Sequence, residues 1–98
     1  MRIEEKFEDE GTRIVFHGNM DLASVDAVRK RLGIIGDSDS PKFILDFQNV
    51  DYVDSAGLGA LVTFYKSQSG RDVVFQNVND RVKKLFRITR LDSIFSLE

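Results

Sequence analysis

Apolar and charged residues alternate over the first twenty residues in a way that predicts a β-hairpin. The apolar residues Met1, Ile3 and Phe7 are separated by charged ones, and the pair Glu10-Gly11 is typical of a turn. A second β-rich run follows at residues 13–17. We therefore expect two strands at the start of the chain.

After this hairpin the apolar residues recur at the spacing of a helix. Residues 22–35 place three valine and leucine side chains at positions i, i+3 and i+7, which form one face of a helix. Residues 36–41 have the composition of a loop. The mostly apolar run at residues 42–47 has the length and pattern of a central strand that is covered on its faces.

The second half of the chain repeats this alternation. Residues 57–68 carry apolar side chains at helical spacing, so a second helix begins close to Ser55, with Asp54 or Ser55 as its cap. Residues 72–78 predict another strand, and Asn79 is the expected cap of a third helix.

The predicted order is ββαβαβα in a single domain of residues 1–98, because a chain this short cannot build two cores. Helical crossovers imply parallel pairing of strands two, three and four, with strand one antiparallel at an edge. The fold class is therefore α/β, with a mixed, mostly parallel four-stranded sheet and helices packed on it. The residues after 90 are expected only to pack against this body.

Polar residues gather at the predicted carboxyl edge of the sheet. Asp21 follows strand two, Asp46 lies near the end of strand three, Asp54 and Ser55 join strand three to the next helix, and Asn77 ends strand four. Ligand and partner sites in open α/β sheets lie just beyond this edge. These residues are therefore the candidates for a site.

Composition narrows the chemistry that this edge can support. Sixteen acidic against fourteen basic residues give a net charge of -2, which is too balanced for a general nucleic-acid or anionic-membrane binder. Without cysteine and with His17 as the single histidine, the chain has nothing from which to build a thiolate or histidine metal cluster. No apolar run approaches the roughly 20 residues of a membrane span, and the acidic start is unlike a signal peptide. We expect a cytoplasmic protein without metal or cofactor.

The segment DSAGLG, from Asp54 to Gly59, has two interpretations. As a helix start, Asp54 or Ser55 caps a free N–H group while the glycines let the turn pack close to the sheet. As a phosphorylation site, Ser55 would place a phosphate at the free N–H groups and the positive end of the helix dipole, with Asp54 and Asp46 repelling it. The second interpretation predicts a switch that leaves the fold intact.

Signals for catalysis are weak in this sequence. The run GLGALV lacks the third glycine of a dinucleotide fingerprint, and the chain has no phosphate-binding loop of the G-x-x-x-x-G-K-[ST] type. His17 lies within a predicted strand, so an ordinary strand position is favoured over a triad with Ser55. Carboxylates such as Asp21 and Asp46 are typical of caps and turns. We therefore expect no enzymatic activity.

Charge is unevenly distributed along the chain. The third predicted helix carries an excess of basic residues, whereas residues 37–54 hold five acidic residues against Lys42. The basic residues are Arg81, Lys83, Lys84, Arg87 and Arg90. A solvated face is typical of such a run, and a docking surface is the alternative.

Four segments together resemble a known family. The segments that carry this resemblance are the strand and turn KFILDFQNVDYVDSAGLG, its continuation ALVTF, the upstream GNMD and the closing NDRVKKLFRITRLDSIF. In these segments the chain is similar to bacterial anti-sigma factor antagonists, which are stand-alone STAS domains. The resemblance covers essentially the whole chain. It implies a small sheet with helices packed on it, in agreement with the order derived above.

The resemblance also implies a partner switch. Members of this family bind a serine-kinase anti-sigma factor and so release a sigma factor; phosphorylation of a serine at the start of the second helix inactivates them, and a serine phosphatase reverses this. The matching serine is Ser55, and because the next residue is Ala56, no second hydroxyl competes with it. Asp21 matches an acidic position that contributes to kinase contact, with capping of the first helix as the alternative. The partner-binding residues implied in this way are Asp21, Asp54, Ser55, Ala56, Gly57 and Leu58.

A second class of function remains open at this point. STAS domains also act as permanent subunits, for example as small partners of lipid-transport ATPases, without a phosphorylation cycle. Co-purifying partners separate the two classes, because a kinase indicates sigma-factor control and a transport ATPase indicates the alternative.

Overall fold

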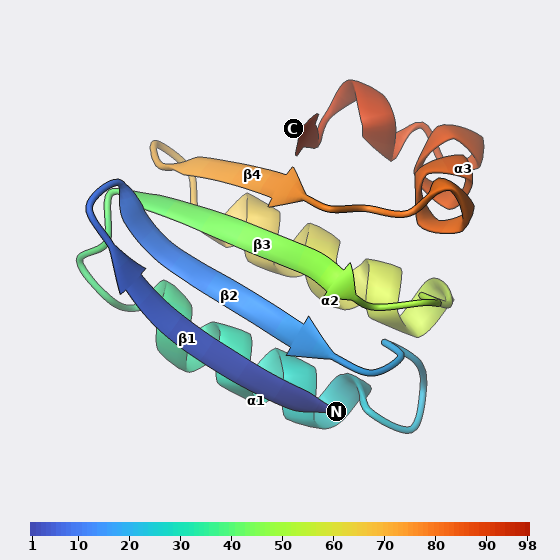
Figure 1. Ribbon diagram of the computed structural model, residues 1–98, viewed down its shortest axis with the longest axis horizontal. Helices are drawn as coiled ribbons and strands as arrows, with labels where there is room; N and C mark the ends of the chain where they lie inside the picture. Colours follow the sequence, from blue (N-terminus) through green and yellow to red (C-terminus); the bar gives the residue numbers. More distant parts are fainter.

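The computed structural model describes residues 1–98 and consists of one mixed β-sheet with its long helices behind it (Figure 1). The elements in chain order are β1 (Arg2–Glu8), β2 (Gly11–His17), α1 (Val25–Gly36), β3 (Lys42–Asn49), α2 (Ser55–Ser67), β4 (Asp72–Gln76), α3 (Asp80–Ile88), a short 3-10 turn (Leu91–Ser93) and β5 (Ser96–Leu97). The strands are ordered β1-β2-β3-β4-β5 across the sheet. β1 is antiparallel to β2, and all other neighbours are parallel.

The predicted α/β order and the pairing of the first four strands are confirmed, but the sheet has five strands rather than four. β5 is only two residues long, which is too short to show an alternating pattern. It reaches the sheet because Arg90, at φ 62°, turns the chain after α3, and because Phe95 is buried against Phe75. The final residues therefore extend the sheet beyond β4 instead of only packing against it.

Two predicted boundaries also move inward. The first helix begins at Val25 rather than residue 22, because residues 22–24 form a turn that Asp21 and Ser24 hold together. The strand predicted at 72–78 ends at Gln76, because Asn77 has a φ of 59° and leaves the extended conformation.

The core lies between the sheet and the helices that cover one of its faces. Phe75 of β4 is fully buried at its centre. Its ring lies 5.6 Å from that of Phe47, 5.7 Å from that of Phe86 and 4.5 Å from that of Phe95, measured between centroids. This one ring thus joins β3, β4, α3 and the C-terminal segment. None of the helices has the length and apolar character that a membrane span requires.

Replacing Phe75 by alanine should therefore destabilise the whole domain. We expect a loss of about 3–5 kcal/mol in the free energy of unfolding, because the substitution removes a buried aromatic ring and leaves a cavity. Phe7 of β1 is 80% exposed, so Phe7→Ala is the matched control and should change stability by no more than about 0.5 kcal/mol. Urea unfolding of both variants measures the difference, and equal stabilities would contradict the assigned core.

Candidate functional site

The loops that leave β2 and β3 are tied to each other at the carboxyl edge of the sheet. The amide of Met20 donates to the carbonyl of Tyr52 at 3.0 Å, and the amide of Asp54 donates to the carbonyl of Met20 at 3.1 Å. Met20 and Val53 form a parallel bridge between these hydrogen bonds. The loop that carries Asp21 is therefore fixed beside the start of α2.

Asp54 is the cap of α2, which decides between the two caps expected from the sequence. Its backbone is extended, and its Oδ1 accepts a hydrogen bond from the amide of Gly57 at 3.0 Å. Its Oδ2 accepts from the amide of Leu22 at 3.0 Å. One carboxylate therefore both starts the helix and holds the neighbouring loop in place.

Because Asp54 supplies the cap, the side chain of Ser55 is free. Ser55 is the first residue of α2, it is exposed, and its hydroxyl takes part in no hydrogen bond within the protein. The amides of Ser55 and Ala56 likewise have no acceptor in the protein. The first amides of α2 that donate are those of Gly57, to the Asp54 side chain, and Leu58, to the Asp54 carbonyl. An accessible hydroxyl thus stands beside two unused N–H donors at the positive end of a helix dipole.

Asp21 lies in the adjoining loop and has a structural role of its own. Its Oδ1 accepts from the amide of Ser24 at 3.1 Å, and its own amide donates to the Ser24 hydroxyl at 3.1 Å. These two bonds hold the turn before α1, but the N-cap position of α1 is Ser24 and has no side-chain cap hydrogen bond, so the expected capping of α1 by Asp21 is wrong. The other carboxylate oxygen of Asp21 accepts no hydrogen bond from the protein, and the side chain is half-buried.

Two of the partner-binding residues expected from the resemblance are covered. Leu58 belongs to the buried core, and Gly57 is buried against the Met20 backbone. A Cβ atom on Gly57 would lie 2.4 Å from the Met20 carbonyl oxygen, so only glycine fits there. Gly57 and Leu58 thus position Ser55 rather than offering side chains to a partner.

Exposed apolar side chains flank Ser55 on both loops and were not expected from the sequence. Leu22 is 76% exposed and Tyr52 is 43% exposed. No sequence signal indicates the exposure of Leu22, because it lies three residues before Val25 on the predicted apolar stripe. Together with the residues already placed here it forms an accessible area, called the entry surface below. The entry surface consists of Asp21, Leu22, Tyr52, Asp54, Ser55 and Ala56.

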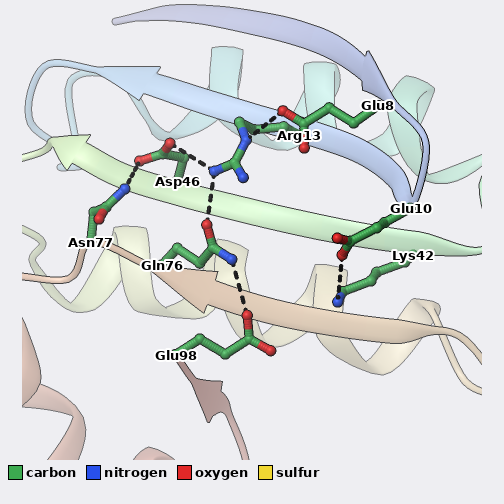
Figure 2. A network of polar contacts seen from close by, with 8 residues as sticks. All are labelled: Glu8, Glu10, Arg13, Lys42, Asp46, Gln76, Asn77 and Glu98. Atoms are coloured by element: carbon green, nitrogen blue, oxygen red, sulfur yellow. Dashed lines mark hydrogen bonds and ion pairs between the residues drawn. The ribbon is translucent and has the colours of Figure 1, made fainter.

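Asp46 does not belong to this surface, so the expectation that it lies beside Ser55 is wrong. It points to the face of the sheet that carries no helix, where Figure 2 shows it inside a polar network. Its Oδ2 accepts from Arg13 at 3.0 Å and its Oδ1 from Asn77 at 3.0 Å. Arg13 also donates to Glu8 at 2.8 Å. Asn77, the other residue expected at the edge, therefore donates its hydrogen bond on this open face of the sheet.

This network fixes the charge of Asp46. Burial acts to raise the pKa of Asp46, but hydrogen bonds from Asn77, the Gln48 amide and Arg13 outweigh it, and the pKa lies below its ordinary value. The hydrogen bond to Glu8 is the main reason that the pKa of Arg13 is raised. The pair is therefore ionised at neutral pH.

The structure places no catalytic partner beside Ser55. His17 is hydrogen-bonded to Glu4 and Asn49, and its interaction with Glu4 lowers the pKa of that carboxyl. No group of three or more histidine, aspartate or glutamate side chains is arranged to hold a metal ion. The arrangement at Ser55 is therefore that of an accessible hydroxyl on a rigid scaffold.

Comparison with known families and proteins gives consistent results. The family model for the STAS domain matches residues 3–98. A curated relative from Staphylococcus aureus (strain NCTC 8325 / PS 47), named anti-sigma-B factor antagonist, is 27% identical over 96 residues, which are 96% of this chain and 89% of the relative.

Solved structures share the same fold. An anti-sigma factor antagonist from Mycobacterium paratuberculosis superposes with a TM-score of 0.91 at 18% identity, over 98% of this chain and 83% of that one. The Bacillus cell fate determinant SpoIIAA in its phosphorylated form superposes with a TM-score of 0.73 at 16% identity, over 99% of this chain and 91% of that one.

Gly57→Ala should destabilise the start of α2. Because its Cβ would collide with the Met20 carbonyl, we expect a loss of about 1–3 kcal/mol in the free energy of unfolding. A Cβ atom on Gly33 of α1 would have no neighbouring atom within 4 Å, so Gly33→Ala is the matched control and should stabilise by about 0.4–1 kcal/mol. Urea unfolding that ranked the two variants in the opposite order would contradict this packing.

The lowered pKa of Asp46 predicts that the free energy of unfolding decreases as the pH falls. Since ionised Asp46 is favoured in the folded state, its contribution is present above the unfolded carboxyl pKa of about 3.9 and is lost as pH falls through its lower folded value. Asp46→Asn should therefore cost about 1–3 kcal/mol at pH 6 and progressively less below pH ~4.

Urea unfolding of wild type and variant at several pH values between about 6 and 3 measures this difference. Glu10→Gln is the control, because Glu10 forms an exposed ion pair with Lys42 (Figure 2) and such pairs contribute little. A stability difference for Asp46→Asn that stayed constant over this range would show that the network does not fix the charge of Asp46.

Proposed function

The chain belongs to the STAS domain family, and we propose that within this family it is an anti-sigma factor antagonist that phosphorylation of Ser55 switches off. In its unmodified form it binds a serine-kinase anti-sigma factor in the cytoplasm, so that the sigma factor held by that protein is released. The observation that carries the proposal is the free, exposed hydroxyl of Ser55 beside two unused amides, in a chain whose curated relative is named an anti-sigma-B factor antagonist.

The proposed modification is an ordinary phosphoryl transfer from ATP bound to the kinase. The Ser55 oxygen forms a bond to the γ-phosphorus, the bond from that phosphorus to the β-phosphate oxygen breaks, and ADP leaves. The hydroxyl proton passes to a base on the kinase. A serine phosphatase restores the hydroxyl by transferring the phosphoryl group to water. The chain itself is the substrate and supplies no catalytic group.

The phosphate is expected to be accommodated without reshaping the domain. The amides of Ser55 and Ala56 are free to donate to it, and the helix dipole favours an anion at this position. The Asp54 cap already holds the backbone in place. A conformational change is therefore not required for the switch.

The switch acts instead through charge on the entry surface. A phosphoserine adds about -1.5 to -2 charges at neutral pH. These charges lie next to Asp54 and near Asp21, whose free oxygen faces no donor of the protein. Because like charges opposed across an interface cost several kcal/mol, and each 1.4 kcal/mol is about tenfold in affinity, the added phosphate is sufficient to dissociate the complex.

The Ser55 prediction is tested by titrating the anti-sigma factor with variants of this chain. Ser55→Ala should bind like the wild type but accept no phosphate, while Ser55→Asp should bind about tenfold or more weakly because of its added charge. Ser55→Ala should also remain within about 1 kcal/mol of wild-type stability, because Asp54 supplies the cap. Calorimetry and intact mass after incubation with kinase and ATP measure these outcomes.

Ser69, an exposed serine beyond the other end of α2, supplies the control variant Ser69→Asp, which should bind normally. Phosphate incorporated into Ser55→Ala would show that another hydroxyl is the acceptor. Co-purification with a transport ATPase, together with equal affinities of all variants, would favour the alternative role as a permanent subunit of such a complex.

A further inference from the structure

The flank of α3 forms an apolar groove with a basic rim next to the entry surface. A hollow of about 170 Å³ lies between α3 and the loop before α2. Tyr52 and Val53 line it from the loop, and Arg81, Lys84, Leu85 and Ile88 line it from the helix. The helix residues are spaced i, i+3, i+4 and i+7, so they form one continuous stripe along α3. This hollow is called the α3 groove below.

The α3 groove exposes apolar surface that the fold does not use. Ile88 is 69% exposed and Tyr52 is 43% exposed, while Val82, which also lines the hollow, and Phe86 are buried in the core. Single exposed apolar side chains are common on protein surfaces, but two large ones around one hollow form a patch. The hollow is several times the roughly 30 Å³ that a water molecule occupies in the liquid, so it can admit an apolar side chain.

The positive charges at its rim have no partner within the protein. All ion pairs of the structure involve residues of β1, β2, β3, α1 or the turn after β1, and none involves α3. Arg81 and Lys84 are both exposed. Asp51 lines an adjoining hollow with Arg81, yet the two side chains form no ion pair. The groove therefore combines an apolar floor with unpaired cations.

The α3 groove is also continuous with the entry surface. Tyr52 belongs to both, and its carbonyl is fixed by the amide of Met20 in the junction that holds the Ser55 loop. In Figure 1, α3 lies at the same edge of the sheet as the start of α2. The groove is therefore within reach of a partner seated over Ser55 and Tyr52.

We propose that the α3 groove is a second docking site for the anti-sigma factor, and that it receives an apolar side chain flanked by carboxylates. The apolar anchor fills the hollow, and the carboxylates pair with Arg81 and Lys84 at its rim. The basic groove then orients the partner, because the partner's carboxylates are attracted to Arg81 and Lys84 and not to the acidic entry surface. This inference rests on the proposed function, since it assigns a further contact to the same partner.

The first test uses short peptides and does not depend on identifying the anti-sigma factor. A peptide EELFEE should shift the amide resonances of Val53, Leu85 and Ile88 in the labelled chain, whereas KKLFKK and EESSEE should not. The shifts should vanish in Ile88→Ser. No shifts with EELFEE, or equal shifts with KKLFKK, would overturn the proposed chemistry of the occupant.

The second test titrates the anti-sigma factor with groove variants of the full chain. Ile88→Ser and Arg81→Glu should each weaken binding about tenfold or more, as expected for an anchor and its rim charge. Arg81 lies in the first turn of α3, where a glutamate complements the helix dipole, so Arg81→Glu is expected to fold.

Two residues of α1 supply matched controls. Ile34 is 63% exposed on the far helix, and Lys30 is exposed on the same helix, so Ile34→Ser and Lys30→Glu make the same chemical changes away from the α3 groove. Both should bind close to wild type. Amide spectra of all four variants establish that the fold is retained.

The outcomes separate this inference from the proposed function. Groove variants that bind like the wild type while Ser55→Asp binds weakly would overturn the second docking site and leave the Ser55 switch in place. A wild-type chain that binds no anti-sigma factor would overturn the proposed function. Self-association of the wild type that Ile88→Ser abolishes would assign the groove to a second copy of this chain and overturn the inference.

Discussion

The junction at Met20 is the constraint on which the site depends. Its amide and its carbonyl each bond to the loop before α2, and the carbonyl lies so close to Gly57 that no side chain fits between them. The Asp54 carboxylate then closes the same junction by bonding to Gly57 and to Leu22 at once. Two loops that are distant in sequence become one rigid surface, and Ser55 is left with no structural task. Because the cap bond belongs to Asp54, a change at the Ser55 hydroxyl leaves that bond in place.

The order of helices and strands could be predicted because many residues in each element show the characteristic spacing of apolar positions. The helical stripes of α1, α2 and α3 and the apolar run of β3 are independent signals that all favour one α/β topology. β5 could not be predicted in this way, since two residues show no period and their place depends on the packing of Phe95 on Phe75. The exposure of Leu22 could not be predicted for a related reason. Its spacing fits the apolar stripe, but the hydrogen bonds between Asp21 and Ser24 make a turn there.

Asp46 shows how a site prediction fails when the edge of a sheet is considered without its faces. In β3 the side chains of Phe43, Leu45 and Phe47 join the core, so by the two-residue period of a strand Asp46 points to the opposite face. Ile44 on that opposite face is also apolar and buried, so the sequence of β3 does not show the alternation of apolar and polar residues that would separate its two faces. The position of Ser55, in contrast, followed from a local rule, because the start of a helix is marked by its capping residues whatever the sheet does.

The two sides of the molecule use charge differently, and this difference bears on where a partner binds. On the open face of the sheet, Arg13 is matched by Glu8 and Asp46, so its charge is already compensated and offers a partner little that the fold does not supply. At the carboxyl edge the charges are uncompensated: a free oxygen of Asp21 on one loop, and Arg81 and Lys84 on α3. Uncompensated charges beside exposed apolar side chains gain most when a complementary surface approaches. The open face is therefore suited to stabilising the domain, and the carboxyl edge to binding.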